Sequence, residues 1–332
     1  MKVSFKILRQ NNNLSPQFQS YTLDVNPSNT ILECLNRIKW ELDGSLTYRK
    51  NCRNTICGSC AMKINGRSSL ACKENIVGEL KKINPYGGEF IPEIVISPLN
   101  NLPVIKDLVV DMKNFWQDLE TIEPYVSTKA RNIPEKEFLQ TPEERKLLEQ
   151  TGNCIMCGAC YSECNAKEVN QEFVGPHALA KSYRLLTDSR DTNSEKRLEE
   201  YNSVDRGVWG CTRCYMCNEV CPMDVAPLDQ ISKIKSEILA QKDINDGTAI
   251  RHRKVLIELV RDGGWIDERK FGVMVVANYF RDIKGLLSIM PLGLRMLCSG
   301  KFPFSFEPSE GTTEVRSIIS AIKNEESISP NS

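Results

Sequence analysis

The sequence CTRCYMCNEVCP at residues 211–222 has the spacing C-x2-C-x2-C-x3-C-P, which is typical of chains that bind iron–sulfur cubanes. Two-residue gaps let three thiolates meet at one cube, and the fourth cysteine, which precedes the proline, points toward a second cube. This arrangement therefore needs a second cysteine run. One begins 57 residues upstream with the same spacing and with Asn165 in place of the proline, and its cysteines are Cys154, Cys157, Cys160 and Cys164.

A different cysteine pattern lies nearer the N-terminus. Cys52, Cys57 and Cys60 follow the spacing C-x4-C-x2-C, and Cys72 comes after a gap. This spacing is typical of plant-type [2Fe–2S] sites. Each of the two irons needs two thiolates, so a loop wraps the cluster while the fourth ligand arrives from elsewhere. Gly58 within the loop allows the backbone to approach the cluster closely.

The residues around this loop predict its fold. Apolar side chains alternate with polar ones at positions 3–7 and 21–25, which predicts a β-hairpin with one buried face. Thr30 and Glu33 form a predicted capping box for the helix that follows. The Asn65-Gly66 pair predicts a second hairpin, which brings the fourth cysteine back to the loop. A strand pair, a helix and a cysteine-bearing loop follow one another in this order in β-grasp ferredoxins.

Composition narrows the class of protein. The 332 residues include 43 basic and 43 acidic side chains, so we expect no nucleic-acid partner. Fourteen cysteines in triplets at ligand spacing indicate thiolate coordination rather than disulfides. We see neither a signal peptide nor a transmembrane helix, because the most apolar window is shorter than the ~20 residues needed to span a bilayer. The expected location is therefore the cytoplasmic side of a membrane, as a peripheral protein.

The predicted fold class is α+β. An N-terminal β-grasp [2Fe–2S] ferredoxin domain precedes an α-helical, bacterial-ferredoxin-like domain with two cubane-type clusters, and a helical extension follows. The predicted boundaries are 1–112 for the first domain, 113–140 for a linker, 141–246 for the second domain and 247–332 for the extension.

The chain resembles the iron–sulfur subunit of succinate dehydrogenase and fumarate reductase. The resemblance covers about residues 1–235 and rests on both cysteine patterns together with the segments YRKNC at 48–52, CGSCAM at 57–62, INGR at 64–67, LAC at 70–72, PVIKDLVVDM at 103–112, GP at 175–176 and DSRD at 188–191. It implies a β-grasp domain that faces a flavoprotein carrying FAD, and a helical domain that faces the electron acceptor.

The resemblance also implies three ligand sets. A [2Fe–2S] cluster would be bound by Cys52, Cys57, Cys60 and Cys72. A [4Fe–4S] cluster would be bound by Cys154, Cys157, Cys160 and the distant Cys221. The family usually has a [3Fe–4S] cluster at the third site, at the positions of Cys164, Cys211 and Cys217.

This sequence departs from the family at the third site. Cys214 adds a fourth thiolate at cubane spacing, which predicts a second [4Fe–4S] cluster in place of [3Fe–4S]. The usual proline, tryptophan and histidine of the quinone site are replaced by Asn165, Val169 and Thr212. We therefore expect quinone to be reached only indirectly, as in the non-classical branch whose acceptor subunits are themselves cysteine-rich and related to heterodisulfide reductase.

No catalytic residue is predicted, because the sequence has no phosphate-binding loop, dinucleotide motif or nucleophile–base pair. The resemblance implies an electron-transfer subunit of succinate dehydrogenase, in the respiratory chain and the tricarboxylic acid cycle, that links a flavoprotein to a membrane acceptor. The first alternative is the same module in a thiol-linked fumarate reductase or heterodisulfide-reductase-like complex. The second is a non-redox scaffold in which zinc occupies the thiolate sites.

Three features outside the motifs have competing interpretations. Cys34 and Cys298 are predicted to be packed apolar residues rather than ligands, and His177 and His252 to have packing or surface roles. The apolar stretch at 271–306, with its scattered basic residues, fits a docking surface for a partner subunit, an in-plane membrane helix or an ordinary core extension.

Overall fold

The protein is described here by a computed structural model that covers residues 1–11, 14–88, 92–128, 132, 137–241 and 247–328. The predicted turn at residues 12–13 and the predicted end of the second domain at 242–246 lie outside these ranges. The described chain forms two compact units, residues 1–240 and 241–332. Both ferredoxin-like parts lie in the first unit, apart from the last few residues of the predicted second domain, whereas the predicted extension belongs entirely to the second.

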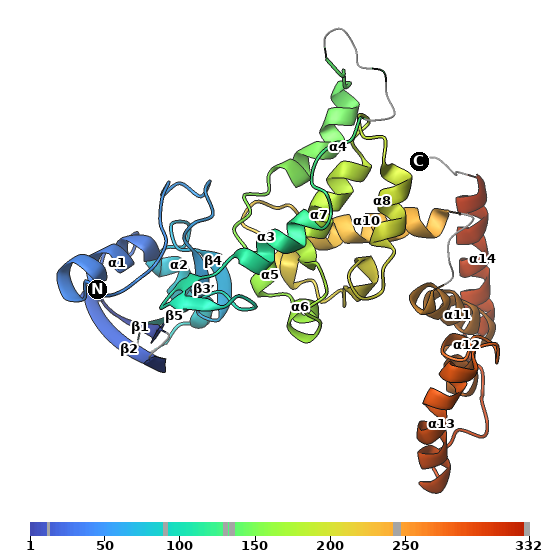
Figure 1. Ribbon diagram of the computed structural model, residues 1–332. Helices are drawn as coiled ribbons and strands as arrows, with labels where there is room; N and C mark the ends of the chain where they lie inside the picture. The colour runs from blue at the N-terminus through green and yellow to red at the C-terminus, as the bar shows by residue number, and fades with distance from the viewer. Residues whose placement is uncertain (12–13, 89–91, 129–131, 133–136, 242–246, 329–332) are drawn as a thin grey trace. The chain divides into compact units, whose positions relative to one another are not determined.

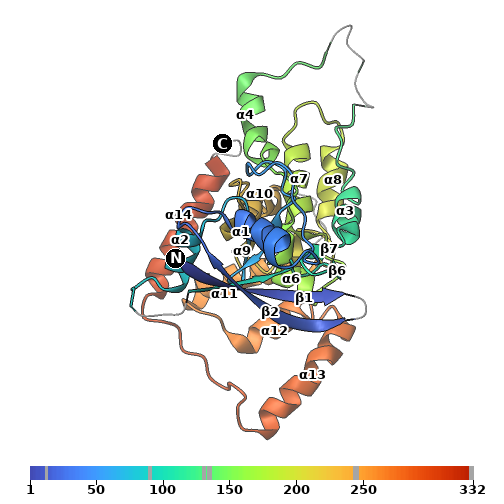
Figure 2. The same cartoon turned by 90° about the vertical axis from the view of Figure 1, so that its left-hand side faces the viewer.

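A mixed sheet forms the N-terminal part of the first unit (Figure 1). The strand β1 pairs antiparallel with β2 and parallel with β5, and the strand order is β4-β3-β5-β1-β6-β7. The strands are β1 (Lys2–Asn11), β2 (Leu14–Asp24), β3 (Ala61–Ile64), β4 (Arg67–Leu70), β5 (Glu93–Ser97), β6 (Val104–Lys106) and β7 (Val109–Val110). The long β1–β2 hairpin is seen best in Figure 2.

The predicted alternation is confirmed along β1, where every second side chain is buried. Val3, Phe5 and Ile7 are inaccessible to solvent and share one core with α1 (Ile31–Arg37), the helix that follows the hairpin. The predicted capping box is present, because Thr30 accepts from the Glu33 N–H while the Glu33 carboxylate accepts from the Thr30 N–H. The N-terminal part therefore has the predicted β-grasp order of strand pair, helix and cysteine loop.

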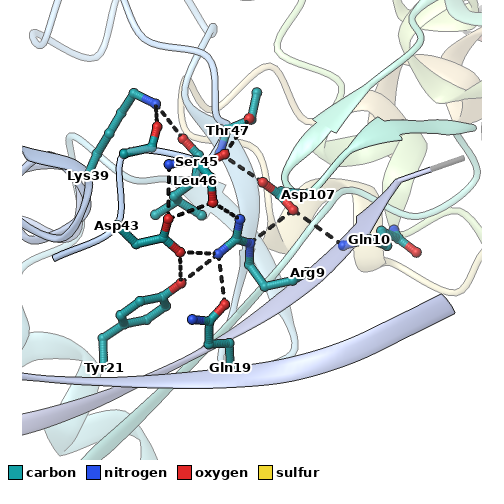
Figure 3. A network of polar contacts seen from close by, with 11 residues as sticks. Arg9, Gln10, Gln19, Tyr21, Lys39, Asp43, Ser45, Leu46, Thr47 and Asp107 are labelled. Carbon is teal, nitrogen blue, oxygen red and sulfur yellow. Dashed lines mark hydrogen bonds and ion pairs between the residues drawn. The ribbon is translucent and has the colours of Figure 1, made fainter. Parts of the chain in front are cut away.

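A buried arginine ties the sheet to the segment that leads into the cysteine loop (Figure 3). Arg9 on β1 donates to Asp43 over 2.6 Å and to Asp107 over 3.0 Å. The Asp43 carboxylate also accepts from the Tyr21 hydroxyl over 2.6 Å. Asp107 accepts from the Thr47 N–H over 2.9 Å, which fixes the backbone five residues before the first cysteine.

This network predicts an acid-sensitive N-terminal domain. Hydrogen bonds from Ser45, followed by that from Tyr21, lower the pKa of Asp43 below its ordinary value of 3.8. Because this pKa is lower in the folded than in the unfolded protein, the stabilisation is present above about pH 4 and is lost as the pH falls below it. We expect Asp43→Asn to cost about 1–3 kcal/mol of the free energy of unfolding at neutral pH, and to flatten its decline with acid.

Thermal unfolding between neutral pH and pH 3 measures both effects. Glu41→Gln is the control, because Glu41 forms an exposed i,i+4 pair with Arg37 that is worth less than about 1 kcal/mol. Equal acid profiles for Asp43→Asn and the parent protein would show that the carboxylate does not stabilise the domain.

Helices build the rest of the first unit. They are η1 (Ile38–Leu42), α2 (Ile76–Ile83), α3 (Lys113–Glu120), α4 (Pro142–Gly152), α5 (Ala159–Ser162), α6 (Asn165–Val169), α7 (Gly175–Leu186), α8 (Ser194–Tyr201), η2 (Val208–Gly210), α9 (Met216–Glu219) and α10 (Pro227–Ala240). The helix α7 is buried along most of its length and packs against α4, α5, α8 and α10. The predicted linker contains α3, whose Phe115 is completely buried.

The second unit is a small helical assembly of α11 (Thr248–Gly263), α12 (Glu268–Val275), α13 (Ile283–Cys298) and α14 (Thr312–Ile328). Val255, Leu259 and Val275 form its core. Gly264 ends α11 in the left-handed conformation that favours glycine. No helix among the described residues is both long and apolar enough to cross a bilayer.

Candidate metal centres

The loop at residues 52–60 turns its backbone N–H groups toward its own sulfur atoms. The Cys52 sulfur accepts from the N–H groups of Asn54 at 3.3 Å and Cys57 at 3.4 Å, and the Cys57 sulfur accepts from the Cys52 N–H at 3.4 Å. Arg53 and Thr55 both have φ near +58°, so the chain reverses direction twice within the loop. Alternating left-handed residues of this kind form a concave set of N–H donors that suits an anionic ligand.

The other two cysteines of this group meet on β-structure. Cys60 directly precedes β3 and Cys72 follows β4 by two residues, and the Cys60 carbonyl accepts a hydrogen bond from the Ala71 N–H at 3.1 Å. The predicted Asn65-Gly66 turn is confirmed, and it places the fourth cysteine beside the third. Burial raises the pKa of Cys60 to about 12, with a contribution from the neighbouring Cys72.

Cys57 differs from the other thiols of the loop. Burial raises its pKa, but hydrogen bonds from Ser59 and from the Cys52 N–H outweigh burial and lower the pKa to about 6. A thiol with a lowered pKa is ready to bind a metal as thiolate. The arrangement fits the donor set of a [2Fe–2S] cluster, with thiolates surrounded by backbone donors.

The first cubane run and the distant Cys221 share one cavity. Its lining includes all four cysteines of the second predicted set, Cys154, Cys157, Cys160 and Cys221. The remaining lining residues are almost entirely apolar: Phe115, Ile155, Met156, Gly158, His177, Ala180, Pro222, Met223, Val225 and Pro227. Four thiols in a dry pocket fit a [4Fe–4S] cluster, whose potential depends on burial and on hydrogen bonds to sulfur.

The third predicted set is also brought together. Burial raises the pKa of Cys164 to about 11, and the charges of Cys211 and Cys214 add to this effect. Burial raises the pKa of Cys217 to about 12, and the charges of Cys211, Cys164 and Cys214 contribute to the rise. Cys214 is exposed, whereas Cys164 and Cys217 are buried. The set therefore reaches from the interior to the surface.

The two cysteine runs have the same backbone conformation. Met156 and Gly158 have φ of 53° and 82°, and Arg213 and Tyr215 occupy the equivalent positions with φ of 57° and 70°. A short helix follows in both cases, α5 after Gly158 and α9 after Tyr215. Left-handed backbone is unfavourable for side chains such as those of Arg213 and Tyr215. The loop around Cys214 therefore shares the left-handed positions of the first run despite their cost, which fits the prediction that both runs bind the same kind of cluster.

Neighbouring cysteine sets lie in contact. A Cβ atom at Gly58 would lie 2.9 Å from the Cα of Cys157, so the loop at 52–60 touches the first cysteine run through backbone atoms. Cys160 of the second set lies on α5 and Cys217 of the third lies on α9, and these two short helices contact each other. The three sets therefore form a continuous series from the N-terminal loop to Cys214.

A polar clamp fixes the two ferredoxin-like parts against each other. The Ser68 hydroxyl on β4 donates to Glu163 over 2.6 Å and lies 2.8 Å from the Ser162 hydroxyl, while the Ser68 N–H donates to the same Glu163 oxygen. The amide of Asn101 donates to the Cys164 carbonyl over 3.1 Å. Ser68 and Ser162 are almost inaccessible to solvent. The clamp lies next to the last cysteine of the first run, so it fixes the relative positions of the cysteine sets.

We expect Ser68→Ala to loosen this clamp. The change leaves buried partners without their hydrogen bonds, which costs about 1–3 kcal/mol of the free energy of unfolding. Hydrogen exchange should accelerate at the Asn100 amide, which donates to Ser162 across the interface over 2.8 Å. Ser69→Ala is the matched control, because Ser69 donates to Glu74 within the N-terminal part. Equal exchange at Asn100 in both variants would contradict the clamp.

No group of three or more His, Cys, Asp or Glu side chains in the described ranges surrounds a point suited to a single metal ion. Thiolates that bind a cluster are each bonded to a particular iron, so they need not converge on one point. The grouping of thiols, the inward N–H donors and the apolar lining fit three clusters. The assignment of the twelve cysteines as ligands remains a prediction.

The structure also shows the surroundings of three residues outside the motifs, two cysteines and a histidine. His177 is completely buried, stacks on Phe115 at 3.9 Å between ring centroids and bonds the Phe115 carbonyl through Nε2. Burial lowers its pKa to about 3, so the ring is neutral. The packing role is therefore confirmed. Cys34 is buried as predicted, but the prediction for Cys298 was wrong, since this thiol is exposed at the end of α13.

Comparisons with known proteins agree with these sites. Residues 4–117 match a family described as a 2Fe-2S iron-sulfur cluster binding domain, and residues 150–225 match a 4Fe-4S dicluster domain. The chain is 38% identical over 244 residues to the mitochondrial succinate dehydrogenase [ubiquinone] iron-sulfur subunit 3 of Arabidopsis thaliana, a match that covers 72% of this chain and 76% of that one. This chain belongs to the family of succinate dehydrogenase and fumarate reductase iron–sulfur subunits.

Two further comparisons bear on the family and on the fold, respectively. The fumarate reductase iron-sulfur subunit of Haemophilus influenzae is 35% identical over 248 residues, covering 71% of this chain and 92% of that one. A chain of the Mycobacterium smegmatis Sdh1 complex shares the fold with a TM-score of 0.63 and 24% identity, over 73% of this chain and 97% of that chain. Succinate dehydrogenase and fumarate reductase subunits have similar sequence identity to this chain, 38% and 35%, so identity establishes the family without distinguishing the two enzymes.

Proposed function

We propose that this subunit transfers electrons from a succinate-oxidising flavoprotein, which carries FAD, to a membrane-associated or cysteine-rich acceptor. The observation that supports this proposal is the unbroken series of three cysteine sets, joined where Gly58 touches Cys157 and where α5 contacts α9. Iron–sulfur clusters take up and release single electrons, so three in series would connect a two-electron flavin to a distant acceptor.

Residues of this chain would bind the clusters, keep water away from them and stabilise the thiolate charges. The [2Fe–2S] cluster would be held by Cys52, Cys57, Cys60 and Cys72. A [4Fe–4S] cluster would be held by the set that includes Cys154 and Cys221, and a second [4Fe–4S] cluster by the set that includes Cys164 and Cys214. Apolar residues around the Cys154–Cys221 cavity exclude water, and backbone N–H groups stabilise thiolate charge in the N-terminal loop. The exposed Cys214 would give the last set access to an acceptor at the surface.

The proposal also assigns a partner to each domain and a location to the protein. The β-grasp domain at 1–112 would face the flavoprotein, and the helical domain at 141–246 would face the acceptor. We expect the protein to be peripheral to a membrane, with quinone reached through a partner subunit. A thiol-linked fumarate reductase using the same module is the alternative, and the flavoprotein that co-purifies distinguishes the two.

The proposal is tested by purifying the native complex anaerobically, identifying the flavoprotein and adding substrates separately. Succinate should bleach the visible absorption of the iron–sulfur subunit, since reduction weakens the bands of these clusters. A complex that responds to a thiol donor with fumarate, and not to succinate, would support the alternative. Zinc in place of iron and sulfide would point to the scaffold.

A further inference from the structure

An exposed apolar stripe runs along α13 in the second unit. Ile283, Leu287, Met290, Leu294 and Leu297 follow the spacing i, i+4, i+7, i+11 and i+14, which places them on one helix face. Between 48% and 70% of each of these side chains is exposed. The helix contains no buried residue, and Figure 1 and Figure 2 both show it apart from α14. Within the described part of this unit, nothing covers the stripe.

The charges around α13 are almost all positive. Residues 279–304 contain Arg281, Lys284, Arg295 and Lys301, whereas Asp282 is the only acidic residue. Asp282 is engaged as the helix N-cap, where it accepts from the Gly285 N–H over 3.0 Å. The whole chain has no net charge, so this excess is local.

The polar residues of α13 lie on a narrow strip. Lys284, Ser288 and Arg295 follow one another at helical spacing beside the apolar stripe, with Pro291 between the last two. Long basic side chains at such a boundary bury their methylene groups while the charge remains in water. Pro291 has no N–H for the Leu287 carbonyl, so this carbonyl needs another hydrogen-bond partner, which water supplies at a membrane surface.

Aromatic residues flank both ends of the helix. Phe280 precedes α13 with 67% of its surface exposed, and Phe304 follows it with 75% exposed. Aromatic side chains favour the boundary between lipid tails and headgroups. A 16-residue helix is about 24 Å long, shorter than the ~30 Å hydrocarbon core of a bilayer. Such a helix lies in the membrane surface instead of crossing it.

We propose that α13 binds the surface of a membrane containing anionic lipid, with its apolar stripe among the acyl chains. Lys284 and Arg295 then contact lipid headgroups from the edge of the stripe. Apolar area and electrostatic attraction together determine the affinity of such helices. A membrane surface accounts for the stripe and for the excess of positive charge, whereas a second copy of this chain would bring the same basic residues together. This proposal goes beyond the electron-transfer function and does not depend on it.

The test is flotation of the full chain with phosphatidylcholine vesicles, with and without phosphatidylglycerol. Binding is expected only to the anionic vesicles at moderate salt. Leu287→Ser with Leu294→Ser should weaken binding by more than roughly 100-fold, because two large apolar side chains no longer enter the lipid. Lys284→Gln with Arg295→Gln should weaken it roughly 30-fold and remove the preference for anionic lipid.

Ile318→Ser with Ile322→Ser is the matched control, because these residues form an exposed apolar pair at i,i+4 on α14. This variant should float like the parent chain. Failure of the parent chain to float would overturn the proposal, as would undiminished flotation of the leucine variant. Self-association that needs Leu287 and Leu294, without flotation, would show that a second copy covers the stripe. All variants should keep the helical circular dichroism and the thermal unfolding of the parent chain, which shows that the second unit is folded.

Discussion

Replacement of Cys221 with alanine is expected to remove a whole [4Fe–4S] cluster, leaving about six of about ten irons in each chain. The reason is that Cys221 lines the same cavity as Cys154, Cys157 and Cys160, although more than fifty residues separate it from them in sequence. Without Cys221, all three remaining thiols come from one short run, so the cluster would be held from one side only, whereas the third set keeps ligands from both runs when Cys214 is lost. Iron and acid-labile sulfide analysis after anaerobic purification measures the loss.

Two comparisons make this prediction specific. Cys154→Ala should give the same loss and the same spectral change as Cys221→Ala, because the two thiols belong to one set. Cys298→Ala should change neither the iron content nor the spectrum, since Cys298 is exposed and lies outside the motifs. The assignment fails if Cys221→Ala removes the signal of the third set instead of the second. In the complete complex, Cys221→Ala should also reduce electron delivery to the acceptor to background.

Replacement of Cys214 with alanine is expected to convert the third cluster from [4Fe–4S] to [3Fe–4S]. The other three thiols of this set stay in place, and Cys164 and Cys217 are buried, so the cluster should persist with one iron fewer. An oxidised three-iron cluster is paramagnetic, whereas an oxidised four-iron cluster of this kind is not. Electron paramagnetic resonance of the oxidised variant should therefore show a new signal.

The conformation of the loop makes this prediction sharper. Arg213 and Tyr215 are held in the left-handed conformation that the first run shows at Met156 and Gly158. If Cys214 binds iron, Cys214→Ala should also release this loop and accelerate its hydrogen exchange. Cys298→Ala is again the control for loss of an exposed thiol. A three-iron signal already present in the oxidised parent protein, unchanged in the variant, would show that Cys214 is not a ligand.

Spacing and periodicity predicted much of this architecture, because the features concerned are local. The alternation along β1, the Thr30 capping box and the Asn65-Gly66 turn depend on a few neighbouring residues, and the structure confirms all three. The partition of eight cysteines into two crossed sets came from the resemblance. The cavity that holds Cys221 with the first run agrees with that partition.

Other features depend on contacts between distant segments, which no local pattern reveals. The Ser68–Glu163 clamp joins residues 95 positions apart. His177 is a polar residue at a core position, and it is buried because its ring stacks on Phe115 from the predicted linker. Cys298 follows apolar residues at helical spacing, and such spacing does not distinguish a helix face packed on a core from one exposed to its surroundings.

The central claim is that twelve thiolates in three contiguous sets hold three clusters. Iron, acid-labile sulfide and zinc contents of the anaerobically purified chain test it most directly. About ten irons and about ten sulfides per chain, with no zinc, are expected. A protein that contains zinc without labile sulfide, or no metal at all, would contradict it.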